Sequence, residues 1–125
     1  MKNPTQDECD KALRGNGAGY VYALLEIEDK ATYENISYAI DDPDFLKNNE
    51  IAYIGETSNV YGRFGAHRSA KDKSRKIQMV VIDETDSDYP VPEIQMKEQT
   101  AMFNYARYHG NLPKWNKGGT TFSGA

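Results

Sequence analysis

Three stretches of the chain have the pattern of β-strands. Residues 19–28 alternate aromatic and aliphatic side chains, and apolar residues fall on both faces of this predicted strand. A short apolar run over residues 51–55 predicts a second strand. Residues 76–85 predict a third, with Ile77, Met79 and Val81 on one side and Val80 and Ile82 on the other. Because both faces of the first strand are apolar, we expect it in the centre of the sheet.

Helical patterns occupy three other segments. Asn3 and Pro4 make a helix start, and Gly15-Asn16-Gly17 makes a stop, so residues 4–14 predict a short helix packed on the core as an appendage. Residues 58–70 and 91–108 predict two further helices. The longer of these has an apolar stripe that consists of Ile94, Glu98, Ala101, Met102 and Tyr105.

Glu98 is the charged member of that apolar stripe. A carboxylate at such a position is either paired inside the protein or directed at a metal ion. The natural internal partners are Arg63 and the tyrosines of the sheet. The pattern alone leaves both interpretations open.

The segment between the first two strands, residues 29–50, is an acidic insertion with the turn signal Asp41-Asp42-Pro43-Asp44. Residues 31–40 within it fit a helix and a strand equally well. We expect a flexible tail over residues 117–125. The order of elements predicts an α+β domain over residues 19–116, preceded by the appendage at 1–18, with a small central three-stranded antiparallel sheet flanked by helices.

The composition sets further bounds. A chain of 125 residues with one cysteine, Cys9, is one domain without an intrachain disulfide or a multi-cysteine zinc site. No apolar run approaches the roughly 18 to 20 residues of a spanning helix, and the acidic N-terminus lacks a signal-peptide pattern. We therefore expect an intracellular protein that has no membrane partner.

The charge is distributed unevenly. The net charge is −4, but residues 1–56 carry 5 Lys/Arg against 12 Asp/Glu, whereas residues 57–125 carry 10 against 7. An overall acidic chain has no general attraction to nucleic acid. A local basic strip could still bind phosphates, although a solvated helix face is the plainer interpretation. The predicted nucleic-acid-binding residues are Arg63, Arg68, Lys71, Lys73, Arg75 and Lys76.

The segment 51–67 combines groups that suit phosphate chemistry. An apolar strand ends at Gly55, and Arg63 and His67 then lie four residues apart. If a helix starts at Ser58, this spacing puts the guanidinium and the imidazole on one face. Without further residues, a solvated helix face is the plainer interpretation of the pair.

Two triplets extend this pattern into a family resemblance. Tyr53-Ile54-Gly55 matches the second motif of the GIY-YIG nuclease superfamily, and Tyr20-Val21-Tyr22 stands at its first motif, with Tyr20 where the family more often has Gly. Further residues follow in the family's order: Arg63, His67, Glu98 and Asn116. The resemblance covers most of residues 19–116 and implies the same three-stranded sheet.

The resemblance implies a metal-dependent endonuclease of the stand-alone restriction, phage or mobile-element kind. Glu98 is then the expected ligand of Mg²⁺ or Mn²⁺, and Arg63 the residue that holds the scissile phosphate. Tyr22 is expected to take a proton from water, with Tyr53 hydrogen-bonded nearby and His67 assisting. Tyr22 and Tyr53 would otherwise be core aromatics with a hydrated hydroxyl.

The resemblance also implies partners and supporting residues. Gly55 and Asn116 are expected to be structural near the site. DNA is the expected partner, with RNA open as an alternative, and a homodimer would serve double-strand cleavage. The expected location is the cytoplasm or nucleoid, or the host cytoplasm for a phage protein.

A catalytically inactive module that binds protein or nucleic acid is the rival function. The acidic first half and Glu56, directly after Tyr53-Ile54-Gly55, favour this rival. Glu56 would either repel DNA or recruit a second cation. The combined set of candidate catalytic residues favours the enzyme: Tyr22, Tyr53, Arg63, His67 and Glu98.

Overall fold

The computed structural model describes residues 19–28, 35–69, 76–85 and 91–116. Its strands are β1 (Tyr20–Glu26), β2 (Ile36–Tyr38), β3 (Tyr53–Thr57) and β4 (Ile77–Glu84). Its helices are α2 (Phe45–Asn48), α3 (Val60–Ser69) and α4 (Val91–His109). The helix and appendage predicted within residues 1–18, and the tail predicted at 117–125, lie outside the described residues.

The strands form one mixed sheet in the order β2-β4-β1-β3. β1 lies between β3 and β4, the central position that its two apolar faces predicted, and it is antiparallel to both, whereas β2 is parallel to β4. The three predicted strands are therefore antiparallel neighbours, but the expected wholly antiparallel sheet of three strands is wrong, because β2 adds a fourth strand in parallel pairing. β2 has only three residues, too few for an alternation to show, and it forms by pairing with the edge of β4 that β1 leaves open.

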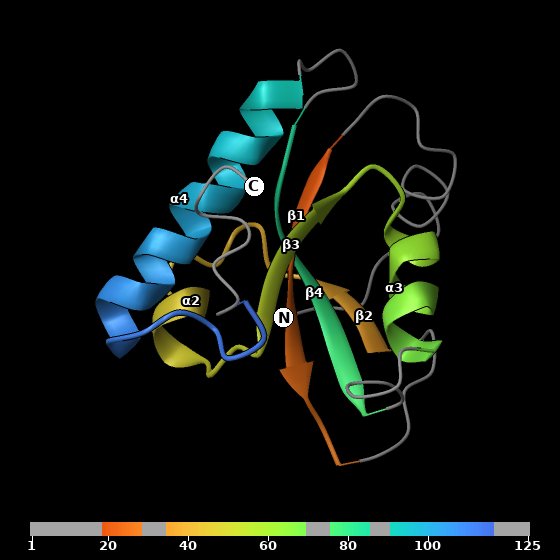
Figure 1. Cartoon of the computed structure of the whole chain (residues 1–125), viewed down its shortest axis with the longest axis horizontal. Coiled ribbons are helices and arrows are strands. Elements are labelled where there is room, and N and C mark those ends of the chain that lie inside the picture. Colours follow the sequence, from red (N-terminus) through yellow and green to blue (C-terminus); the bar gives the residue numbers. More distant parts are fainter. Residues whose placement is uncertain (1–18, 29–34, 70–75, 86–90, 117–125) are drawn as a thin grey trace.

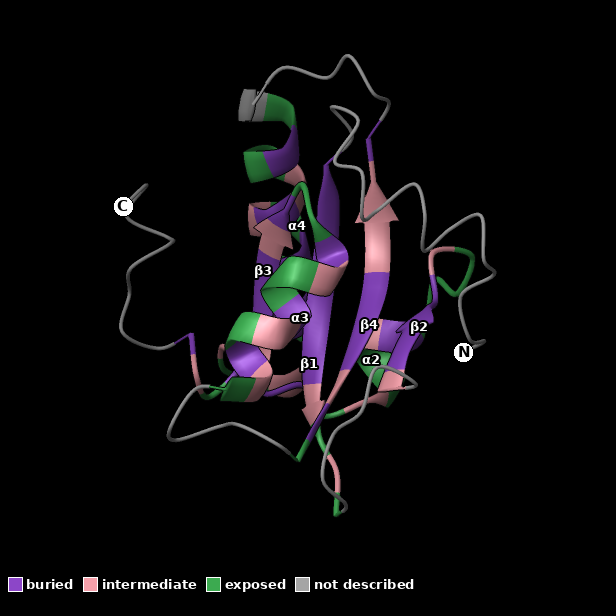
Figure 2. Cartoon of the chain, turned by 90° about the vertical axis from the view of Figure 1, so that its right-hand side faces the viewer, coloured by how far each residue is buried: buried purple, intermediate pink, exposed green. Residues whose placement is uncertain are grey.

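The sheet separates two layers of helices (Figure 1). α3 packs on one face, over a core that includes Tyr20, Tyr22 and Leu24 of β1. α4 and α2 cover the other face, where Val21 and Ala23 point. Figure 2 shows β1 buried along most of its length behind α3. The alternation predicted for this strand is therefore confirmed.

α3 begins two residues later than predicted, at Val60 instead of Ser58. Asn59 caps the helix, because its Oδ1 accepts a hydrogen bond from the Gly62 N–H at 2.9 Å. This start directs three side chains of α3 into the core: Val60, Phe64 and His67.

α4 is the longest helix of the described segments, and it lies along the sheet face opposite α3 (Figure 1). Its predicted apolar stripe is buried throughout, at Ile94, Glu98, Ala101, Met102 and Tyr105. Within the described segments, no helix is both long and apolar enough to cross a membrane.

Candidate active site

The pairing of β1 with β3 brings the two motif tyrosines together over Gly55. Tyr22 lies opposite Gly55, and Tyr53 lies opposite Leu24, so the tyrosines are diagonal neighbours on the α3 face. Their ring centroids are 6.1 Å apart. A Cβ atom on Gly55 would lie 2.6 Å from Tyr22 Oη and 2.8 Å from Tyr53 Cε2. Gly55 has no side chain, and the two tyrosine rings occupy the space that a Cβ atom would otherwise fill.

α3 adds His67 to this pair. His67 Nε2 lies 2.7 Å from Tyr22 Oη, a hydrogen bond whose direction depends on the imidazole tautomer. The imidazole centroid is 5.6 Å from the Tyr22 ring and 5.3 Å from the Tyr53 ring. Tyr22 is fully buried, and His67 is only 8% exposed. Three rings from two strands and one helix thus converge on one point.

The environment keeps both tyrosines protonated at neutral pH. Burial raises the pKa of Tyr22 well above its ordinary value, and the charge of Arg63 and a hydrogen bond from it act in the opposite direction. Burial also raises the pKa of Tyr53, and the charge of Glu98 adds to that shift. The hydroxyl groups are therefore available as neutral donors.

Arg63 lies one helical turn before His67 and is exposed on α3. Its guanidinium lowers the pKa of Tyr22, of Tyr53 and of Glu98 through its positive charge. One cation thus acts on groups from β1, β3 and α4. Its exposure leaves it accessible to an anion from solution.

Glu98 reaches the same neighbourhood from the buried side of α4. The residue is 9% exposed, and burial, with the charge of Glu56 adding to it, raises the pKa of its carboxyl group to about 7. Within the described segments, no hydrogen bond or ion pair satisfies this carboxylate. A buried carboxylate of this kind suits a cation.

Glu56 is a member of this neighbourhood whose role sequence reasoning left undecided. Along β3, residues 54 and 56 point to the α4 face, so Glu56 lies on the side from which Glu98 approaches. Its charge raises the pKa of both Glu98 and Tyr53. The alternation of side chains along residues 53–57 was the sequence signal that could have placed Glu56 on this face.

In the described part of the chain, no three His, Cys, Asp or Glu residues group as metal ligands.

Asn116 fixes the edge of β3 beside the site. Its Nδ2 donates to the Ile54 carbonyl at 2.9 Å, and its Oδ1 accepts the Ile54 N–H at 2.7 Å. The Trp115 N–H also donates to the Ala52 carbonyl at 2.8 Å. Asn116 is 2% exposed, so these bonds are shielded from water. The loop after α4 thus covers the strand that carries Gly55.

The predicted basic strip is described only at its ends. Arg68 is half-buried in the last turn of α3, and Lys76 is exposed just before β4. Lys71, Lys73 and Arg75 lie outside the described residues.

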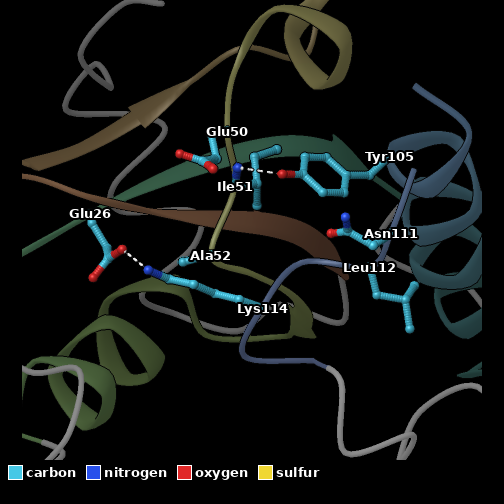
Figure 3. Close-up of a pocket in the computed structure, with 8 residues that line it drawn as sticks. All are labelled: Glu26, Glu50, Ile51, Ala52, Tyr105, Asn111, Leu112 and Lys114. Atoms are coloured by element: carbon cyan, nitrogen blue, oxygen red, sulfur yellow. Dashed lines mark hydrogen bonds and ion pairs between the residues drawn. The ribbon is translucent and has the colours of Figure 1, made fainter. Parts of the chain in front are cut away.

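Two pockets lie away from the candidate catalytic residues. One, of about 120 Å³, is bordered by Lys114, which pairs with Glu26, and by Tyr105, whose Oη accepts the Ile51 N–H at 3.1 Å (Figure 3). The other, of about 180 Å³, lies between α2 and α4. Neither pocket includes a residue of the Tyr22 and His67 cluster.

Comparison with known families gives one match. The model of the GIY-YIG catalytic domain matches residues 18–109, more than half of the 125-residue chain. No curated protein and no solved structure matches the chain. The matched range includes both tyrosine motifs, Arg63, His67 and Glu98, and it ends before Asn116. The chain therefore belongs to the GIY-YIG catalytic domain family.

Proposed function

We propose that the chain is a metal-dependent endonuclease that hydrolyses phosphodiester bonds of DNA, a stand-alone enzyme of the restriction, phage or mobile-element kind. The family consists generally of endonucleases, which supports a nuclease-type function. The observation that carries the proposal is the 2.7 Å contact of Tyr22 Oη with His67 Nε2. It joins a proton donor to a proton acceptor beside the exposed guanidinium of Arg63.

Glu98 would hold the divalent cation, Mg²⁺ or Mn²⁺. The residue is mostly buried, and its carboxylate receives no hydrogen bond or ion pair from the described segments, so a bound cation would stabilise its charged form. A single carboxylate with several waters is a common way to hold Mg²⁺. When bound, the ion would stabilise the charge that grows on the phosphate and on the departing 3′ oxygen.

Tyr22 would take the proton of the attacking water and pass its own hydroxyl proton to Nε2 of His67. The water oxygen forms a bond to phosphorus, the bond from phosphorus to the 3′ oxygen breaks, and the departing 3′ oxygen takes a proton from solvent water. Burial raises the pKa of Tyr22, so the phenol is still protonated when the step begins. It needs no prior ionisation, because His67 takes the hydroxyl proton as the proton of the water arrives. Arg63 would hold the scissile phosphate through its forked donors.

The basic strip would bind the DNA backbone next to this centre. Arg68 and Lys76 are its described members, and Lys71, Lys73 and Arg75 complete it in the sequence. Because neutralised phosphates release counterions, reversing the charges of Lys71 and Lys73 should flatten the salt dependence of binding by about two log units per log unit of salt. Lys47→Glu, on the exposed side of α2, is the matched control and should leave the slope nearer to wild type.

The test is incubation of the purified protein with supercoiled plasmid in Mg²⁺, in Mn²⁺ and in EDTA, with RNA of the same sequence in parallel. We expect nicked and linear DNA in the metal-containing reactions, and intact plasmid in EDTA. Cleavage of the RNA alone would move the substrate class from DNA to RNA. Nicking that gives way to linear product would also suit two copies that act on the two strands. We place the enzyme in the cytoplasm.

A non-catalytic binding module is the second candidate function. The observation that favours it is Glu56, whose charge adds to the negative side of the site. Intact plasmid in both metals, together with retained DNA or protein binding, would support this module and would contradict the enzyme.

A further inference from the structure

The large apolar side chains that are exposed in the described segments all belong to α4. Met96 is 67% exposed, Phe103 is 60% exposed and Tyr108 is 45% exposed. Single exposed apolar residues are common on protein surfaces. Met96 and Phe103 are seven residues apart and so share one side of α4, which sets that side apart from the rest of the described surface.

The exposed positions of α4 follow the spacing of a helix-packing seam. Steps of three and four residues join Glu93, Met96, Thr100, Phe103 and Arg107, and all five are exposed. This alternation is the a and d spacing of a heptad, by which two helices pack along their length. At about 100° per residue, the seam falls on the side of α4 opposite its buried stripe. We call these five residues the outer seam.

The outer seam is complementary to itself in an antiparallel arrangement. Glu93 lies in the first turn of α4, and Arg107 lies in the last. With a two-fold axis near Thr100, Met96 of one copy faces Phe103 of the other, and Glu93 faces Arg107. A parallel arrangement would place like charges opposite each other, which is unfavourable. Self-complementarity of this kind is the requirement of a two-fold interface.

The contacts of Arg107 hold its charge at the surface. Its Nη2 donates to Asn104 Oδ1 at 3.2 Å, and its Cζ lies 5.6 Å from the centroid of the exposed Tyr108 ring. Both contacts are with residues of the last two turns of α4. The guanidinium therefore stays at the end of the seam where Glu93 of a second copy would arrive.

We propose that the outer seam is a self-association surface, and that its occupant is a second copy of this chain with the two α4 helices antiparallel. Two apolar pairs and two ion pairs are few beside the contacts of an obligate interface, so the dimer dissociates on dilution. The proposal does not depend on the nuclease assignment. If that assignment holds, the dimer carries two sites, one for each DNA strand, because Glu98 faces away from the seam.

The test is sedimentation velocity across about a hundredfold range of protein concentration, enough to change the occupancy of a weak dimer. The wild-type sedimentation coefficient should rise with concentration, and Phe103→Glu should remain at the monomer value. Gln95→Glu puts the same charge on an exposed position of α4 outside the seam, and it should behave as wild type. All of these positions are exposed, so melting curves should confirm that each variant folds.

A charge swap distinguishes the antiparallel pairing from other contacts. Glu93→Arg alone and Arg107→Glu alone each bring like charges together and should weaken the dimer. The double variant restores opposite charges and should recover association. A wild-type protein that stays monomeric throughout, a Phe103→Glu variant that still dimerises, or a double variant weaker than both single variants would overturn the proposal.

Discussion

Tyr22 Oη and His67 Nε2 lie 2.7 Å apart although 45 residues separate them in the chain. The contact exists because Tyr22 is central in β1 and points to the face that α3 covers, while the cap at Asn59 turns His67 inward. Burial of both residues removes competing water. The proposed proton path therefore depends on how the sheet and α3 pack together.

Tyr22→Phe removes the hydroxyl and keeps the ring. The cleavage rate should fall by about 10² to 10⁴-fold, the usual contribution of a general acid or base, with a loss of stability of about 1 kcal/mol. Tyr105→Phe is the matched control, because it deletes another buried tyrosine hydroxyl, on the opposite face of the sheet. Comparable cleavage by the Tyr22 and Tyr105 variants would refute the path.

Gly55→Ala should disturb both tyrosines at once. The new Cβ would lie 2.6 Å from Tyr22 Oη, so the rings must shift, which should lower the free energy of unfolding by about 1 to 3 kcal/mol. The displaced rings should also remove most of the cleavage activity. At Gly62 the nearest atom is the amide end of the Asn59 side chain; moving it loosens the cap of α3, and the higher helix propensity of Ala offsets that cost. Urea unfolding of Gly62→Ala should therefore differ from wild type by less than about 1 kcal/mol. Equal costs at the two glycines would argue against the close approach at Gly55.

Asn116→Ala should lower the stability of the fold clearly but the cleavage rate only slightly. It leaves the Ile54 N–H and carbonyl without their side-chain partner beneath the loop, a cost of about 1 to 3 kcal/mol. Asn111→Ala, in the same loop but exposed, serves as the control. Denaturant curves should separate the two variants, whereas cleavage per folded molecule should remain within about tenfold of wild type, because Asn116 contacts no reacting group. A denaturation midpoint for Asn116→Ala equal to that of Asn111→Ala would show that the clamp contributes little.

Glu98 should make the metal-free protein less stable as the pH rises. Its pKa is about 7 in the fold against an ordinary value of 4.5, so the folded state holds a proton that the unfolded state has released between these values. Its contribution to stability is therefore greatest below about pH 4.5 and falls until about pH 7. In EDTA, Glu98→Gln should become more stable relative to wild type as the pH rises from 5 to 8. Glu28→Gln, at an exposed position, is the control and should show no such gain. Parallel curves for all three proteins would mean that Glu98 is not desolvated.

The central strand and the site neighbourhood were within reach of sequence reasoning. Tyr20, Tyr22 and Leu24 alternate with apolar residues, which requires burial on both faces and predicts a central strand. The register that opposes Tyr22 to Gly55 is a finding of the structure. Glu98 could be recognised because a charge on an apolar stripe needs an explanation.

Other features depended on tertiary contacts that no local pattern encodes. β2 is fixed by its parallel pairing with β4, not by a periodicity of its own. The influence of Glu56 on Glu98 requires β3 and α4 to pack together. The choice of Asn59 over Ser58 as the cap was open in the sequence, because both residue types are good N-caps.

The central claim is that Glu98 supports the chemical step and not the fold. The most direct test is the cleavage rate of supercoiled plasmid by Glu98→Gln in Mn²⁺, with Glu28→Gln as the control and melting curves on the same preparations. The substitution keeps shape but removes the charge that would hold the cation, so cleavage should fall by about 10² to 10⁴-fold or more, with DNA binding and folding retained. A Glu98→Gln protein that cuts at the wild-type rate, or that melts well below wild type because a charge is left uncompensated, would contradict the account.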